Sequence, residues 1–135
     1  MRRALLLALL LSLSLVHPRS ETWCQGEGRG EGAVERGKQI VLGRDSNCLL
    51  CHEVPDAGGR AMGNLGPSLA GTGARHTPEE LRLRIVDSLR LNPESIMPSY
   101  HRVDGLERVG DEWRGKPVLS AQQVEDVVAY LRTLR

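Results

Sequence analysis

The residues with the clearest chemical potential in this chain are two cysteines and a histidine in the segment Cys48–His52, which reads C-x-x-C-H. Two thiols at this spacing can share one helical turn, where each can add to a vinyl group of a haem. The adjacent imidazole of His52 would then be directed at the iron as an axial ligand. The spacing therefore predicts one haem c, attached covalently through Cys48 and Cys51.

Two other chemistries use closely spaced cysteines: a structural zinc site and a dithiol redox centre. A zinc site needs a second pair of cysteines or histidines downstream, and a thioredoxin-type centre needs a strand before the motif. The chain has one further cysteine, Cys24, and the residues before Cys48 have a helical pattern punctuated by glycine. The haem interpretation is therefore favoured over both alternatives.

A haem iron held by His52 needs a second axial ligand on its opposite face. Met97 is favoured, because Pro98 biases it to an extended conformation and holds its thioether on a stiff loop. The alternative is that Met97 fills the core, a role that suits methionine. A His and Met pair closes the iron to substrate, which favours an electron carrier over a haem enzyme or a ligand sensor with an open site. Four other side chains are competing candidates for this ligand: Met62, His76, His101 and Cys24.

The segment Gly66-Pro67-Ser68-Leu69 offers a carbonyl group that can orient the histidine. A ligating imidazole usually donates its other N–H to a fixed acceptor, which sets its tautomer and orientation. The carbonyl oxygen of Pro67 is the candidate acceptor for His52. A simple turn is the alternative interpretation of this segment.

Three helical segments are expected around these residues. Apolar residues at helical spacing predict a first helix over 33–42, in which Gly37 allows another helix to approach closely. A capping box at 77–80, with proline at the first helical position, predicts a second helix that ends before Asn92. A second capping box at 120–123 opens a terminal helix with a continuous apolar face.

The segments between these helices have no regular pattern. Residues 56–73 are rich in glycine and are expected to form a long loop, and residues 103–119 to form a short extended turn or plain loop. A bound cofactor would have to order loops of this length. The chain is therefore predicted to be all-α, with three to four helices wrapped round the covalent haem.

The N-terminus has the pattern of a secretory signal. Two arginines precede the apolar stretch 4–16, which is shorter than the ~20 apolar residues of a spanning helix. We expect a signal peptide over 1–20, a flexible glycine-rich lead-in over 21–32 and one haem domain over 33–135. The mature protein is expected in the periplasm, without a membrane span. Its formal net charge of +1, with both signs interspersed, argues against nucleic acid as a partner.

Together these features resemble the class I cytochromes c. Within that fold the resemblance narrows to the SoxX family, the monohaem subunits of the thiosulfate-oxidising SoxAX cytochromes. The similarity covers most of the predicted mature chain and rests on four segments: NLGPSL at 64–69, LRIVD at 83–87, NPESIMPSY at 92–100 and GKPVL at 115–119, which leads into the terminal helix.

The resemblance implies a role that the haem motif does not specify. In the class I cytochromes c the carbonyl of the proline matching Pro67 accepts the N–H of the haem-ligating histidine, His52 here. SoxX pairs with a SoxA-type haem subunit, and the heterodimer joins thiosulfate to a cysteine of the carrier SoxYZ. SoxX is then the non-catalytic, electron-transferring subunit of an L-cysteine S-thiosulfotransferase and passes electrons to a small cytochrome. The alternative is a freestanding periplasmic shuttle of a respiratory chain. Cys24 and the short N-terminal segment depart from the family pattern.

Overall fold

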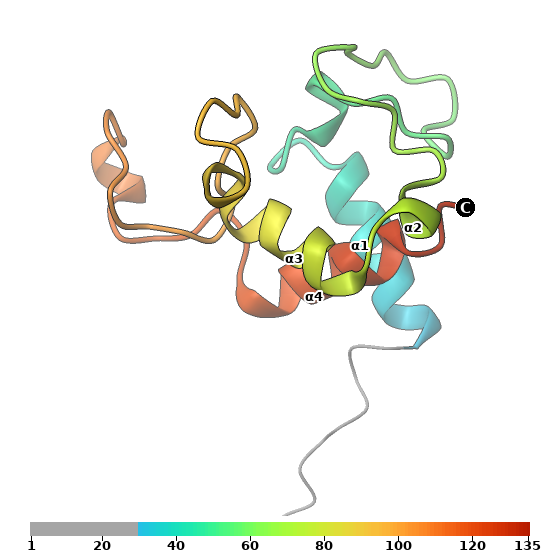
Figure 1. Cartoon of the computed structure of the whole chain (residues 1–135). Helices are drawn as coiled ribbons and strands as arrows, with labels where there is room; N and C mark the ends of the chain where they lie inside the picture. Colours follow the sequence, from blue (N-terminus) through green and yellow to red (C-terminus); the bar gives the residue numbers. More distant parts are fainter. Residues whose placement is uncertain (1–29) are drawn as a thin grey trace, which may run out of the picture.

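The computed structural model describes residues 30–135, and within this range the fold is all-helical, without strands (Figure 1). This confirms the predicted fold class. The predicted signal peptide, most of the lead-in and Cys24 lie outside the described residues. Four α-helices are present in the described range: α1 (Glu31–Leu42), α2 (Thr72–Arg75), α3 (Pro78–Asp87) and α4 (Ala121–Leu131). Three short 3-10 helices join them: η1 (Cys48–Leu50), η2 (Ser88–Arg90) and η3 (Asp111–Trp113).

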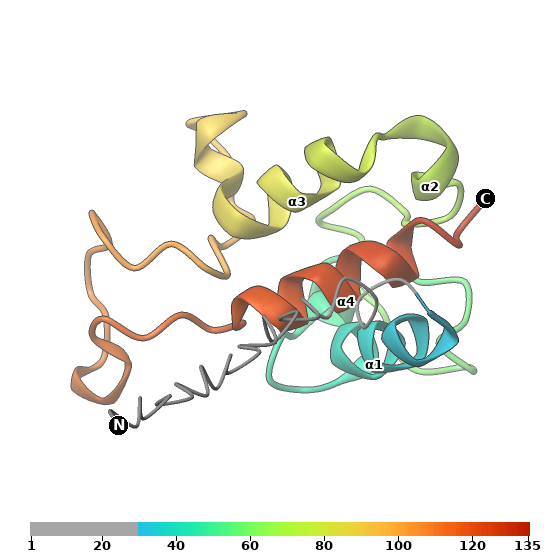
Figure 2. The ribbon, with the colours of Figure 1, turned by 90° about the horizontal axis from the view of Figure 1, so that it is seen from below.

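Helices α1 and α4 cross in close contact and carry much of the core (Figure 2). Their closest approach is at Gly37, where a β carbon would overlap the carbonyl group of Asp126 and lie 2.9 Å from Cβ of Tyr130. Only glycine fits at this crossing, as the sequence pattern indicated. The core contains the buried apolar side chains of both helices and of α3: Val41, Leu81, Ile85, Val124, Val127, Val128, Tyr130 and Leu131.

Both predicted capping boxes are present. Thr77 Oγ1 accepts a hydrogen bond from the backbone N–H of Glu80, and the Glu80 carboxylate accepts one from the Thr77 N–H in return. Ser120 and Gln123 make the same reciprocal pair at the start of α4. These bonds satisfy backbone donors that a helix leaves open at its first turn, so they fix where α3 and α4 begin.

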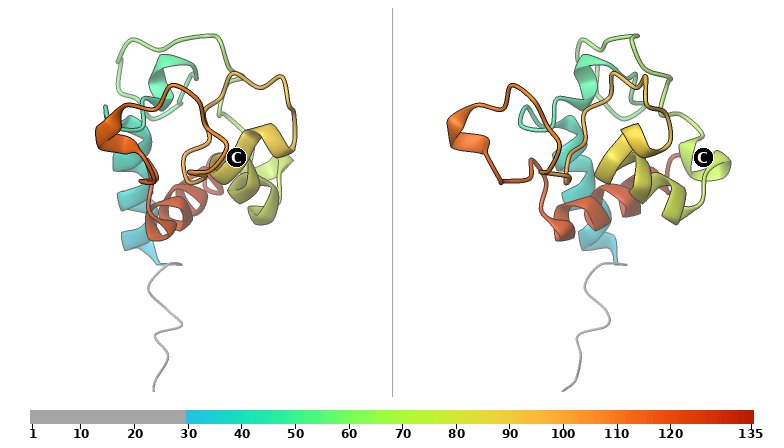
Figure 3. Two further views of the ribbon diagram at one scale, coloured as in Figure 1. Left: turned by 90° about the vertical axis from the view of Figure 1, so that its left-hand side faces the viewer. Right: turned by 60° about the vertical axis from the view of Figure 1, so that its left-hand side comes forward.

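The loops differ from the expectation in two places. Helix α2 lies at the end of the segment predicted as a glycine-rich loop, where a β carbon at Gly73 would lie 2.8 Å from Cα of Arg132 and the Gly73 N–H donates to the Leu134 carbonyl. This helical turn depends on contact with the chain terminus, so no local pattern predicted it. The segment 103–119, expected to form a short extended turn or plain loop, contains the 3-10 turn η3, and it projects from the helices (Figure 3).

Among the helices of residues 30–135, none combines the length and the apolar character needed to cross a bilayer.

Candidate functional site

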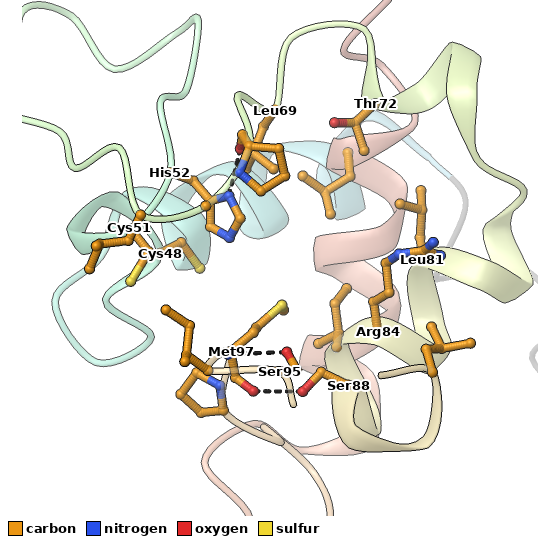
Figure 4. Close-up of a pocket in the computed structure, with 18 of the residues that line it drawn as sticks. Cys48, Cys51, His52, Leu69, Thr72, Leu81, Arg84, Ser88, Ser95 and Met97 are labelled. Carbon is orange, nitrogen blue, oxygen red and sulfur yellow. Dashed lines mark hydrogen bonds between the residues drawn. The ribbon is translucent and has the colours of Figure 1, made fainter. Parts of the chain in front are cut away.

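A cavity of about 570 Å³ lies between the Cys48–His52 turn and the loop that carries Met97 (Figure 4). This volume is within the range of pockets that hold small organic ligands. Its wall is largely apolar, and α3 and the end of α4 close it with these side chains: Leu81, Ile85 and Leu131. Residues that are far apart in the sequence therefore line one cavity.

The two cysteines are positioned by a tight 3-10 turn. The N–H groups of Cys51 and His52 both donate to the Cys48 carbonyl, at 3.2 and 2.9 Å. Asn47 starts the turn in the left-handed region, with φ of 51°, which asparagine tolerates better than most residues. Both thiols are free and line the cavity, and burial raises the pKa of the Cys48 thiol. The turn places two nucleophilic sulfurs beside the same space.

The imidazole of His52 is held by one specific hydrogen bond. Its Nδ1 lies 2.7 Å from the carbonyl oxygen of Pro67. A carbonyl oxygen can only accept, so Nδ1 is the donor, and in the neutral ring the lone pair is then on Nε2. The ring points into the cavity (Figure 4). His52 therefore presents an unprotonated nitrogen of the kind that binds a metal.

Met97 faces His52 across the cavity, and its sulfur points inward (Figure 4). Its backbone is fixed on both sides, since Ser88 Oγ donates to the Met97 carbonyl at 2.6 Å and the Met97 N–H donates to Ser95 Oγ at 3.2 Å. Ser88 is buried in η2, so this loop is tied directly to the helical core. A thioether and an imidazole thus approach one space from opposite sides.

Comparison with known proteins assigns this arrangement to a family. The family model for cytochrome c matches residues 34–135. The chain belongs to the cytochrome c family. A chain in the crystal structure of SoxXA from P. pantotrophus is similar to this cytochrome, with 37% sequence identity and a TM-score of 0.65. The match covers 74% of this chain and 80% of that chain, and it confirms the resemblance to the SoxX cytochromes. No curated protein matches the chain.

The family gives this cytochrome covalently bound haem c and a role in electron transfer. The cavity provides suitable groups for that cofactor. It has two thiols for attachment, an imidazole and a thioether on opposite walls, and apolar side chains between them. Haem supplies the reversible one-electron couple of its iron, and the protein tunes that couple through the ligands and the polarity around them.

The structure separates the competing candidates for the second axial ligand. Met62 lies outside the cavity, and its sulfur accepts a hydrogen bond from the Val54 N–H at 3.1 Å. His101 also lies outside it, with Nδ1 2.8 Å from the Leu119 carbonyl. His76 does line the cavity, and its Nδ1 lies 3.6 Å from a carboxylate oxygen of Glu80. Cys24 is outside the described residues.

Three cavity residues were not predicted as site residues from the sequence: Ser88, Arg84 and Tyr100. Tyr100 lines the cavity and is only 8% exposed. Its hydroxyl donates to the Ser46 carbonyl at 2.7 Å, and burial raises its pKa. This bond joins the segment before the cysteines to the segment after Met97. A contact between residues so distant in sequence leaves no local pattern to detect.

Proposed function

We propose that this cytochrome is the electron-transferring subunit of a two-subunit complex of the SoxXA type, which oxidises thiosulfate. The observation that carries the proposal is the similarity to a chain of SoxXA from P. pantotrophus, at 37% identity over 74% of this chain. The partner would be a SoxA-type haem subunit, bound as a heterodimer. The complex would act on a cysteine of the carrier SoxYZ.

In this proposal Cys48 and Cys51 attach a single haem c, and His52 and Met97 are its axial ligands. The bond between His52 and the Pro67 carbonyl supports this assignment, because it leaves Nε2 free to bind iron. Two protein ligands occupy both axial positions of the iron and leave none for substrate. The cytochrome then acts as a relay, and the sulfur chemistry belongs to the partner subunit.

The electron count fits a relay. Joining a sulfur of thiosulfate to a carrier cysteine forms a sulfur–sulfur bond, releases the thiol proton and frees two electrons. One haem accepts one electron at a time, so this subunit must pass each electron onward before it can accept the next. A small periplasmic cytochrome is the proposed acceptor.

The proposed location is the periplasm, after removal of a signal peptide at 1–20. Attachment of haem to cysteines is completed outside the bacterial cytoplasm, which agrees with an exported chain. The haem domain would occupy 33–135, preceded by a lead-in whose last two residues, Glu31 and Gly32, already belong to α1.

Exchange of Met97 tests the ligand set. Wild-type protein, produced with haem-attachment machinery, should keep its haem after denaturation and be low-spin. Met97→Ala should become high-spin in the reduced state and bind carbon monoxide. Met62→Ala is the matched control, because Met62 lies outside the cavity, and it should remain low-spin. The assignment would be contradicted if the haem is lost on denaturation. It would also be contradicted if Met97→Ala stays low-spin and does not bind carbon monoxide.

Purification with a partner tests the complex. Tagged wild-type protein, mixed with a SoxA-type haem subunit, should elute as one heterodimer in size-exclusion chromatography. Within that complex, the haem of this chain should become reduced when thiosulfate and the carrier are added together. A monomer that does not bind the SoxA-type subunit, yet exchanges electrons with respiratory partners, would support the freestanding shuttle instead.

A further inference from the structure

Several basic side chains line the cavity, and one of them, Arg84, lies on the wall opposite the cysteines (Figure 4). Arg84 projects from α3, and Arg75 and His76 lie at the end of α2. Figure 4 shows Cys48 and Cys51 on one side of the cavity and Arg84 on the other. The positive charge of Arg84 is therefore placed away from the attachment point.

The chemistry of haem gives this wall a specific occupant. The two vinyl groups that react with thiols lie on one half of the porphyrin, and its two propionates lie on the opposite half. Attachment at Cys48 and Cys51 therefore directs the propionates away from the cysteines. We propose that Arg84 is the counter-ion of a haem propionate and thereby raises the reduction potential of the iron. The inference rests on the haem attachment proposed above.

The hydrogen bonds distinguish Arg84 from its neighbour Arg75. The Arg75 guanidinium donates to the carbonyls of Ala70 and Ser68 and to Thr72 Oγ1. Its donors are therefore used in hydrogen bonds to the loop that precedes it. Arg84 makes one hydrogen bond, from Nη1 to the Glu80 carbonyl at 3.2 Å. An arginine has five N–H donors, so Arg84 retains several for a carboxylate.

Among the described residues, the carboxylates near this wall are engaged mainly by other groups. The Thr77 N–H is the main cause that lowers the pKa of Glu80, and the charges of His76 and Arg84 add to it. The Glu80 carboxylate accepts from the Thr77 N–H at 2.9 Å and lies 3.6 Å from His76. Asp87 pairs with Arg102 at 3.3 Å. The carboxylate among the cavity-lining residues is Glu94, which comes from the Met97 loop and not from α3. Arg84 is thus the side chain best able to compensate a propionate.

The expected effect on the iron follows from electrostatics. Ferric haem carries one more positive charge than ferrous haem, and an uncompensated propionate stabilises that extra charge. A guanidinium beside the propionate cancels this effect and favours the reduced state. Removing the guanidinium should therefore lower the reduction potential, because burial and local charge set the potential of a given ligand pair.

The experiment compares two arginines of the same helix. Arg82 also belongs to α3, but it makes a bidentate pair with Glu125 of α4, at 2.5 and 2.7 Å, and does not line the cavity. Holoproteins with Arg84→Gln and Arg82→Gln are titrated spectroelectrochemically at fixed pH. Arg84→Gln should shift the one-electron equilibrium about tenfold toward the ferric state, a fall of about 59 mV. Arg82→Gln should leave the potential unchanged, and Arg84→Lys should restore part of the shift.

An unchanged potential in Arg84→Gln, or equal shifts in the Arg84 and Arg82 variants, would overturn the inference. Should Arg84→Gln fail to retain haem, Arg84→Met keeps a long alkyl chain and provides the same comparison. These results are separable from failure of the proposed function. Wild-type protein without covalent haem contradicts the proposed function, whereas an unchanged potential with haem attached contradicts only the role of Arg84.

Discussion

A β carbon at Gly66 would lie 2.7 Å from Nδ1 and 2.9 Å from Nε2 of the His52 ring. Both distances are shorter than an ordinary van der Waals contact. The backbone at Gly66 thus lies directly against the imidazole, and the next residue, Pro67, accepts the hydrogen bond from the same ring. One short loop fixes both the position and the tautomer of His52.

Gly66→Ala should therefore displace the imidazole and break its bond to Pro67. We expect a lower yield of haem-loaded protein and a larger high-spin fraction, because second-sphere contacts orient a metal ligand. Gly110→Ala is the control, since a β carbon there would meet only Trp113, at 4.0 Å. Absorption spectra of the two variants check the prediction, and equal low-spin spectra would contradict it.

Ser88→Ala should loosen the loop that carries Met97. The Ser88 hydroxyl, on a buried residue, donates to the Met97 carbonyl at 2.6 Å in a partly buried hydrogen bond, and loss of such a bond costs about 0.5–1.5 kcal/mol. The reduced variant should bind carbon monoxide more readily than wild type. Ser120→Ala, at the N-cap of α4, should cost about 1 kcal/mol of unfolding free energy and leave carbon monoxide binding unchanged. Similar binding by both variants would argue against this role of Ser88.

Gly37→Ala should destabilise the crossing of α1 and α4. The added β carbon would overlap the Asp126 carbonyl, and overpacking of this kind costs about 1–3 kcal/mol or more. Gly32→Ala tests the same change in the same helix without the clash, because its β carbon would meet only the flexible end of Arg36, at 3.4 Å. That control should stabilise the protein by about 0.5–1 kcal/mol. Denaturant unfolding measures both, and equal effects would show that the crossing tolerates a methyl group.

The pair between Arg36 and Asp126 should make stability depend on pH in the acid range. The Arg36 guanidinium, hydrogen-bonded to Asp126 at 2.8 and 2.9 Å, holds the pKa of that carboxyl below its usual 3.8, and Gln122 adds to this. A carboxyl with a lowered folded-state pKa stabilises the fold above its unfolded pKa. This contribution is lost as the pH falls through the folded value.

Arg36→Gln should accordingly lower the unfolding free energy by about 1–3 kcal/mol at neutral pH, and its difference from wild type should shrink below about pH 4. Unfolding in urea between about pH 7 and pH 3 measures this. Arg114→Gln is the control, because its pair with Asp111 is exposed on both sides and should contribute little at any pH. A pH-independent difference for Arg36→Gln would contradict the assigned pKa.

The sequence by itself determined the features that depend on neighbouring residues. The capping boxes at Thr77 and Ser120 were predictable because their bonds join residues three positions apart. The C-x-x-C-H motif and the similarity to the SoxX cytochromes indicated the family, which the comparisons confirm. The structure brings together the five predicted site residues, but their roles stay predictions: Cys48, Cys51, His52, Met97 and Pro67.

Tertiary structure alone decided which side chains complete the cavity. Helix α2 forms where Gly73 meets the chain terminus, and Tyr100 is buried because its hydroxyl reaches Ser46 across the fold. Arg84 and Arg82 are alike in the sequence, yet one lines the cavity and the other pairs with Glu125. Helical periodicity assigns a residue to a face, but the packing of distant segments determines what that face meets.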